Sequence, residues 1–172
     1  MTIENIEIEL IKNGFEKSPN SRVLAEFRND DVVILRVNKA FTDFYGYNED
    51  EVIGKNPRVL NSEKMELDYF QKMWESILNP KIGFWKGHII NKKKNGDFIN
   101  VILTIITIFD ENSPPRYFTA YHVDITERKI TEEKLKETEL RSKEAYEQVN
   151  FYKDIFAHDM NNILQVILSS AE

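Results

Sequence analysis

The stretch FWKGHIINKKKNGDFINVILTIITIF, residues 84–109, alternates apolar and polar side chains on both sides of the dipeptide Asn95-Gly96. Alternation with a period of two residues is typical of β-strands, and Asn-Gly is a strong signal for a tight hairpin turn. The stretch therefore predicts two antiparallel strands. A loop at ENSPP, residues 111–115, and the alternating segment RYFTAYHV, residues 116–123, extend the hairpin to three consecutive strands.

A second hairpin is predicted upstream, where RVLAEFR (22–28) and VVILRV (32–37) flank turn residues at 29–31. Residues 38–60 break into short helical turns. A longer helix follows, closed by Asn79-Pro80, with an apolar stripe of Leu67, Phe70, Met73, Trp74, Ile77 and Leu78. Two strands, short helices, one longer helix and three strands indicate an α+β fold.

Two helix starts carry their own signals. Residues 1–19 predict a short amphipathic helix that ends near Gly14, with Ile3, Ile6, Leu10 and Ile11 at helical spacing. Asn48 and Glu51, three residues apart, have the pattern of a capping box that opens a helical turn.

From Asp124 onward the composition changes to that of a long exposed helix. Residues 124–150 contain no glycine or proline and carry closely spaced opposite charges. Heptad steps run through Leu135, Ser142, Val149, Phe156 and Ile163, with companions at Thr138, Ala145 and Tyr152. This pattern predicts a coiled-coil helix whose seam is polar at its start and apolar at its end.

Composition excludes several classes of function. The net charge is −6 with both signs interleaved, so no broad basic surface exists for nucleic acid. The chain has no cysteine, which removes disulfides and thiolate chemistry. The longest apolar run, residues 101–109, is too short to cross a membrane, and the acidic N-terminus is unlike a signal peptide. We therefore expect a soluble, cytoplasmic protein without a nucleic-acid or membrane partner.

The ordered motifs VNKAFTDFYGY, EVIGKNPRVLNS, FWKGHIINKKKNGDFINV and DITERK resemble a PAS domain of sensor kinases. The resemblance covers about two-thirds of the chain and implies a five-stranded antiparallel sheet with short helices on one face around a small-molecule pocket. It sets the expected domains as an N-terminal helix (1–19), a PAS sensor (20–123), a coiled-coil signalling linker (124–150) and a truncated dimerisation and histidine-phosphotransfer helix (151–172).

His158, Asp159 and Asn162 match the phosphotransfer motif of two-component kinases, in which histidine is followed by an acidic residue and, after two variable positions, by Thr or Asn. The resemblance implies that His158 is the phosphoacceptor, that Asp159 orients the ring or takes its proton, and that Asn162 positions a water for dephosphorylation. Helical spacing places His158 about 200° around the helix from Phe156, facing solvent. Ile163 stands where many members have proline, which predicts an unkinked helix.

This reading makes the chain the input and phosphoacceptor portion of a cytosolic histidine kinase. ATP would be used only by a catalytic domain beyond Glu172, so this chain alone should not transfer phosphate from ATP, and a response-regulator receiver domain would take the phosphate. The alternative is a stand-alone PAS module that binds a ligand or partner. Two other interpretations of His158 are that it is a polar residue on a solvated helix face and that it is a metal ligand. A metal site would need further ligands, and His88 and His122 lie on predicted strands of the other domain.

Four asparagines are the candidate ligand-binding residues of the sensor. In flavin-binding PAS domains of the light-sensing LOV type, similar asparagines contact the flavin, and the matching positions here are Asn56, Asn61, Asn91 and Asn100. Pro57 replaces the photoactive cysteine, so a flavin (FMN or FAD) would be bound non-covalently. The same asparagines also occur near turns for backbone reasons, and the helix at 66–78 has no histidine for haem.

Asp124 and Thr126 lie where the last strand meets the long helix, and the resemblance gives them the role of a signal relay. Their side chains can also simply cap that helix. The apolar seam over residues 125–170 predicts a parallel homodimer, to which the N-terminal helix adds contacts.

Overall fold

The computed structural model describes residues 3–29, 31–109 and 115–169, and the chain forms two compact units, Met1–Thr126 and Glu127–Glu172. In chain order the elements are α1 (Ile3–Glu16), β1 (Ser21–Arg28), β2 (Asp31–Val37), α2 (Lys39–Tyr45), α3 (Glu49–Val52), the 3₁₀ helix η1 (Pro57–Leu60), α4 (Leu67–Leu78), β3 (Phe84–Lys92), β4 (Phe98–Phe109), β5 (Pro115–Asp124) and α5 (Thr126–Ser169). Asp30 of the predicted turn, residues 111–114 of the predicted loop and residues 170–172 lie outside the described residues.

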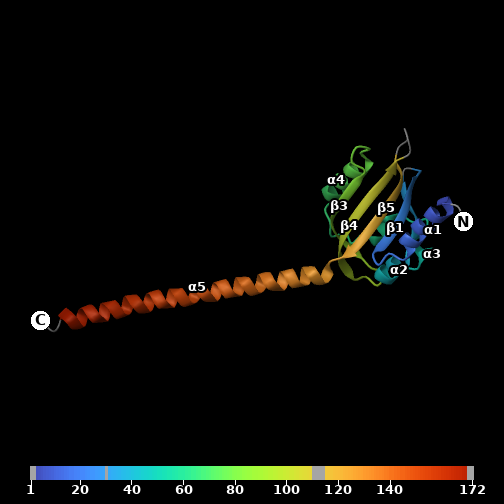
Figure 1. The fold of residues 1–172 in the computed structure, drawn as a ribbon. Coiled ribbons are helices and arrows are strands. Elements are labelled where there is room, and N and C mark those ends of the chain that lie inside the picture. Colours follow the sequence, from blue (N-terminus) through green and yellow to red (C-terminus); the bar gives the residue numbers. More distant parts are fainter. Residues whose placement is uncertain (1–2, 30, 110–114, 170–172) are drawn as a thin grey trace. The chain divides into compact units, whose positions relative to one another are not determined.

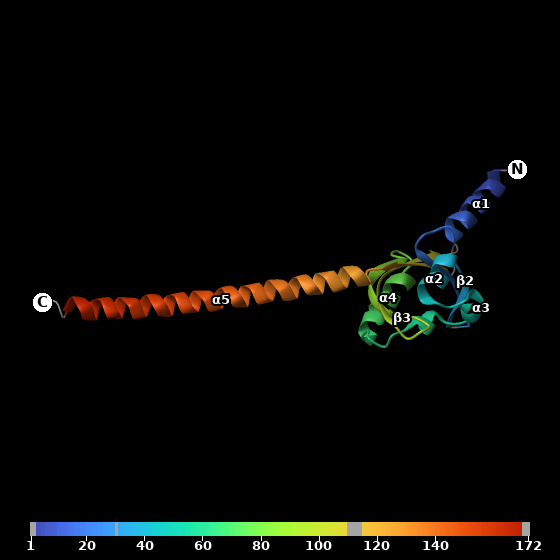
Figure 2. The ribbon, with the colours of Figure 1, turned by 90° about the horizontal axis from the view of Figure 1, so that it is seen from below.

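The first unit is built on one antiparallel sheet with the strand order β2-β1-β5-β4-β3 (Figure 1). The two predicted hairpins are therefore confirmed, and β5 joins them by pairing with both β1 and β4. Helices α2, α3 and α4 lie on the same side of the sheet (Figure 2). The α+β fold with a five-stranded sheet and helices on one face is confirmed.

Alternating burial along the strands sets which face is covered. On β4, Ile99, Val101, Leu103 and Ile105 are buried, whereas the residues between them are partly open to solvent. Because successive side chains in a strand point to opposite faces, this one face forms the core with the helices. The helices contribute their apolar sides to it, namely Phe41, Tyr45, Val52, Met73 and Ile77.

Local signals at the helix ends agree with the sequence, with one difference. The Glu51 carboxylate accepts a hydrogen bond from the Asn48 backbone N–H at 2.8 Å, as the capping box predicted. Helix α1 continues past Gly14 to Glu16, because the Lys17 N–H donates to the Asn13 carbonyl at 2.8 Å and closes a further turn. The expected end near Gly14 is therefore confirmed to within two residues.

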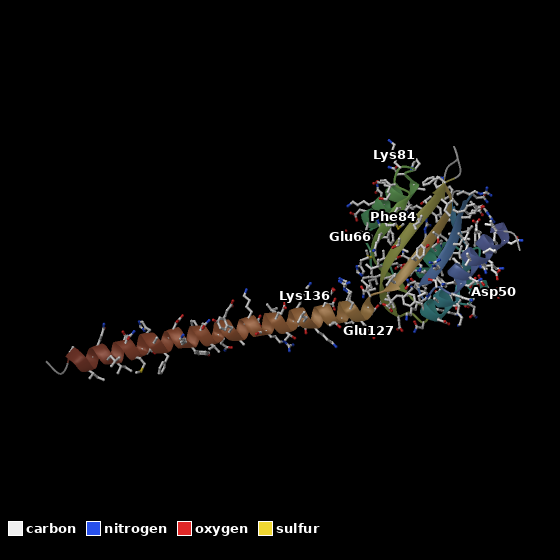
Figure 3. The ribbon with its side chains drawn as sticks, in the orientation of Figure 1. Asp50, Glu66, Lys81, Phe84, Glu127 and Lys136 are labelled. Atoms are coloured by element: carbon white, nitrogen blue, oxygen red, sulfur yellow. The ribbon has the colours of Figure 1, made fainter. Side chains whose placement is uncertain are left out.

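The second unit consists of α5 beyond Thr126, and α5 is one unbroken helix of 44 residues. Pairs of opposite charge one turn apart, such as Arg128 and Glu132 at 2.8 Å, support it. Charged side chains such as Glu127 and Lys136 project outward from the helix (Figure 3). The helix passes through Ile163 without a break, as the missing proline predicted.

The apolar seam of α5 is exposed in the single chain at Val149, Tyr152, Phe156, Met160, Ile163 and Ile167. A coiled coil needs a second helix, so that part of the expectation stays a prediction. Across residues 3–29, 31–109 and 115–169, no helix is long and apolar enough to span a membrane.

Candidate functional site

A cavity of about 370 Å³ lies between the covered face of the sheet and the helices of the first unit. That volume falls in the usual range of small-molecule sites. Its walls are mainly apolar and include Ile34, Met73, Trp74, Ile77, Leu103 and Phe118. The exposed residues Arg58, Asn61 and Leu67 also line it, so the cavity opens to solvent between η1 and the start of α4.

Three of the four predicted ligand-binding asparagines line this cavity, namely Asn56, Asn61 and Asn91. Asn100 does not. In the β3–β4 pairing, Asn91 lies opposite Ile99, and Asn100 lies opposite Ile90. Partners in a strand pair share a face of the sheet, so Asn100 points to the face opposite to the cavity. The expectation that Asn100 contacts the same ligand as Asn91 is therefore corrected.

Asn56 and Asn61 also hold the backbone around η1. The Asn56 side chain accepts from the Arg58 N–H at 2.8 Å and donates to the Asp31 carboxylate. The Asn61 side chain accepts from the Glu63 N–H at 3.0 Å. Asparagine side chains commonly make such hydrogen bonds to the backbone in turns. Asn56 and Asn61 therefore have a structural role at the rim of the cavity, whatever ligand the cavity holds.

The sequence did not single out Tyr45 and His122 as buried polar residues of the cavity region. Asn91 Nδ2 donates to the Tyr45 hydroxyl at 2.7 Å, and burial raises the pKa of Tyr45. The His122 ring meets the Tyr45 ring edge-on at 5.4 Å between centroids, and burial lowers the pKa of His122 to about 3. His122 is therefore a neutral imidazole at neutral pH. The sequence signal was a histidine and a tyrosine at core-facing positions of predicted elements.

Asp124 and Thr126 form the joint between β5 and the start of α5. Asp124 Oδ1 accepts from the Thr126 N–H at 2.8 Å, and Thr126 Oγ1 accepts from the Asn100 N–H at 3.0 Å. The Ile125 N–H donates to the Asn100 carbonyl at 2.9 Å. Asn100 thus secures the joint through its backbone, while its side chain lies 2.8 Å from His88 Nε2.

His158, Asp159 and Asn162 come together on α5. His158 Nδ1 lies 3.3 Å from Asp159 Oδ1 and 3.3 Å from Asn162 Nδ2, and the His158 side chain is 74% exposed. Both neighbours approach Nδ1, which leaves Nε2 directed to solvent without a partner among the described residues. An exposed imidazole nitrogen beside a carboxylate is suited to nucleophilic or proton-transfer chemistry. No metal-binding cluster of three or more His, Cys, Asp or Glu residues occurs within the described ranges.

Comparison with known proteins gives a transcriptional activator and a histidine kinase among the relatives. The chain is 24% identical over 128 residues to the bacterioopsin transcriptional activator of Halobacterium salinarum, a match that covers 74% of this chain and 18% of that protein. It is 27% identical over 114 residues to blue-light-activated histidine kinase 2 of Erythrobacter litoralis, covering 66% of this chain and 32% of the kinase. The chain thus spans a third or less of these relatives.

A solved structure agrees with the fold. The LOV domain of an Erythrobacter litoralis blue-light-activated histidine kinase superposes with a TM-score of 0.57 at 26% identity, covering 64% of this chain and 99% of that domain. The sequence model of the PAS domain matches residues 23–127, which include all five strands apart from the first two residues of β1. The chain therefore belongs to the PAS domain family.

Proposed function

We propose that this chain is the sensory input and phosphoacceptor portion of a two-component histidine kinase. The PAS domain senses a small ligand, a redox state or a partner, α5 relays that signal, and His158 accepts a phosphoryl group. The observation that supports this most directly is His158 with a solvent-facing Nε2 and with Asp159 and Asn162 gathered on Nδ1. The histidine kinases among the relatives agree with it.

His158, Asp159 and Asn162 would act together in transfer of the γ-phosphoryl group of ATP. The lone pair on His158 Nε2 attacks the γ-phosphorus of ATP, the bond to the bridging oxygen breaks, and ADP leaves with that electron pair. The ring proton on Nδ1 is then acidic, and the Asp159 carboxylate accepts it or holds it by hydrogen bond. The phosphoryl group next passes to an aspartate of a receiver domain. Asn162 orients a water for the reverse, dephosphorylating step.

To test this, the chain is mixed with ATP and with the separate ATP-binding domain of a histidine kinase. Acid-labile, base-stable phosphate on the chain supports the proposal. If the ATP carries a labelled γ-phosphate and neither this chain nor a receiver domain becomes labelled, the result supports a stand-alone PAS module that only binds a ligand or partner.

We also propose that the chain forms a parallel homodimer through residues 125–170. Light scattering on the same sample measures the mass in solution, and a monomer at high concentration would contradict the dimer.

A non-covalent flavin is the second candidate for what the cavity holds. Asn56, Asn61 and Asn91 line the cavity and could hydrogen-bond a flavin ring, whereas Asn100 could not reach it. A flavin would supply light absorption or redox chemistry, and Pro57 offers no thiol for a covalent adduct. Flavin absorption bands of the purified protein, and flavin released on denaturation, would support this candidate; a featureless visible spectrum would exclude it.

The hydrogen bond between Asp124 and Thr126 leads to a prediction about how a signal passes from the PAS domain to α5. Asp124→Ala removes the acceptor of the Thr126 N–H, which should loosen the start of α5 at a cost of about 1 kcal/mol. If the joint passes the input to α5, the ratio of kinase to phosphatase activity should change while the PAS core still unfolds cooperatively. Activity assays on a longer chain that contains this sequence measure the ratio.

Asp124→Asn is the matched control, because it keeps an oxygen that can accept from Thr126. We expect it to alter the ratio less than Asp124→Ala does. Equal ratios in the wild type and Asp124→Ala would assign Asp124 to capping alone.

A further inference from the structure

Two side chains approach the same ring nitrogen of His158 on α5. Asp159 Oδ1 and Asn162 Nδ2 each lie 3.3 Å from His158 Nδ1. The carboxylate oxygen of Asp159 can only accept a hydrogen bond, whereas the Nδ2 group of Asn162 can only donate one. A neutral imidazole carries a single ring proton, so its Nδ1 is either a donor or an acceptor. The two neighbours therefore compete for Nδ1 of the neutral ring.

Each neighbour favours a different tautomer of His158. If Nδ1–H donates to Asp159, the lone pair is on Nε2; if Asn162 donates to Nδ1, the ring proton must be on Nε2. Nε2 is the nitrogen that has no partner among the described residues. Attack on phosphorus needs a lone pair on that nitrogen. The bond to Asp159 thus prepares the ring for phosphoryl transfer, and the bond from Asn162 opposes it.

The helix positions Asn162 against the ring. Asn162 follows His158 by four residues, so the two side chains share one stripe of α5 and are one turn apart. Helical side chains lean toward the N-terminus, and the Asn162 amide therefore reaches back over the turn that carries His158. Asp159 is the next residue in the chain, about 100° around the helix, where side chains do not face each other. Asn162 is the better placed of the two to hold Nδ1.

We propose that Asn162 holds His158 in the tautomer with the proton on Nε2, and so lowers the fraction of His158 that is ready to accept a phosphoryl group. The inference rests on the proposed function of His158 and adds a regulation of the same site. This role concerns the unphosphorylated ring and is separate from orienting a water for dephosphorylation. Release of Nδ1 by Asn162, followed by its pairing with Asp159, makes the ring a nucleophile.

Nitrogen-15 NMR of the full chain measures the tautomer directly. In a protein with nitrogen-15 histidine, the chemical shifts of the two ring nitrogens show which of them carries the proton. The chain has three histidines, and His158→Gln removes one set of signals and so assigns it to His158. Spectra are recorded at a pH at which the same signals show that His158 is neutral. We expect most of His158 in the wild type to carry its proton on Nε2.

Two substitutions of Asn162 test its role. Asn162→Ala removes the donor, so the Nδ1–H fraction should rise about twofold, as expected for one exposed bond between residues a helical turn apart. Asn162→Asp keeps the shape of the side chain but can only accept from Nδ1, so it should raise that fraction further. Asn161→Ala is the matched control, because Asn161 is exposed on the same helix and has no hydrogen bond to His158 among the described contacts. It should leave the tautomer unchanged.

The rate of phosphorylation tests the consequence for function. The chain is mixed with labelled ATP and a separate ATP-binding domain, without a receiver domain. The initial rate of labelling of Asn162→Ala should rise by about the same factor as its Nδ1–H fraction, because only that tautomer has the lone pair on Nε2. Asn161→Ala should be labelled at the rate of the wild type.

Failure of this inference and failure of phosphoryl transfer give different results. A wild-type His158 that is mainly Nδ1–H, or the same tautomer ratio in the wild type, Asn162→Ala and Asn162→Asp, would refute the role of Asn162. A raised Nδ1–H fraction with an unchanged initial rate would refute its effect on phosphorylation. If no variant and no wild-type protein is labelled, the proposed function fails, and the NMR spectra still decide whether Asn162 sets the tautomer.

Discussion

His158→Gln should abolish the acid-labile phosphate that the chain acquires from ATP when an ATP-binding domain is supplied. Glutamine keeps the polarity and approximate reach of histidine but has no nitrogen lone pair that can attack phosphorus. The substitution lies on an exposed face of α5, where surface changes usually alter stability by less than about 0.5 kcal/mol. Loss of label would therefore report chemistry and not unfolding. The measurement is labelled phosphate stable to base and released by acid.

The chain offers a matched control, because it has only three histidines. His122 is buried in the cavity wall, and His88 is half-buried with Nε2 held 2.8 Å from Asn100 Oδ1. His88→Gln should keep full labelling, since that imidazole is not free to meet a nucleotide. Label that survives in His158→Gln, or that disappears in His88→Gln alone, would place the acceptor elsewhere and refute the role of His158.

Elements with a strong local signal were predictable from sequence. The hairpin at residues 84–109 was predicted because alternation and the Asn95-Gly96 turn agree on one register, and β3 and β4 pair across that turn. The helix predicted at residues 66–78 agrees with α4 to within one residue, since its apolar stripe has the helical period and Pro80 follows it. In each case a local preference and the tertiary environment favour the same structure.

Which face a residue takes was not predictable where it depends on register. Asn91 and Asn100 are nine positions apart across a hairpin, and a shift of one residue in pairing moves a side chain to the other face. The structure pairs Asn91 with Ile99, which directs Asn100 away from the cavity. The resemblance carried both asparagines over as one set, because the motif alone does not contain the pairing.

The environment of buried polar groups was also beyond the sequence. Tyr45 and His122 are 77 positions apart in the chain, and only the packing of α2 against the sheet brings their rings together. In the sequence, Asn38 marks only the point where the alternation typical of a strand stops and short helical turns begin. It is 1% exposed, and it caps α2 by accepting from the Phe41 N–H at 3.0 Å.

Asn38→Ala should lower the free energy of unfolding of the PAS unit by about 3–4 kcal/mol. The Asn38 side chain bonds three parts of the chain at once. Its Oδ1 accepts from the backbone N–H groups of Arg22, at 2.9 Å, and of Phe41, and its Nδ2 donates toward the carbonyls of Phe15, Ser18 and Asn20 at 3.0 to 3.3 Å. Alanine would remove the side-chain partners of these groups, although the Phe41 N–H keeps the Asn38 backbone carbonyl at 3.0 Å. Each group that is left buried and unsatisfied costs about 1–3 kcal/mol.

The control for this prediction is Asn48→Ala, the same substitution at the N-cap of α3. Asn48 is exposed, so water can replace its bonds, and we expect a loss of about 1 kcal/mol or less. Urea unfolding followed by the fluorescence of Trp74 and Trp85, which both lie in the PAS unit, measures the two losses on the same signal. Asn38→Asp separates the acceptor role of the amide from its donor role. The carboxylate keeps an oxygen that accepts from Arg22 and Phe41, but it places a negative charge against three carbonyl oxygens, so this variant should also be less stable than the wild type. Equal losses in Asn38→Ala and Asn48→Ala would show that Asn38 is an ordinary helix cap and that the connection from α1 to β1 is held by other contacts.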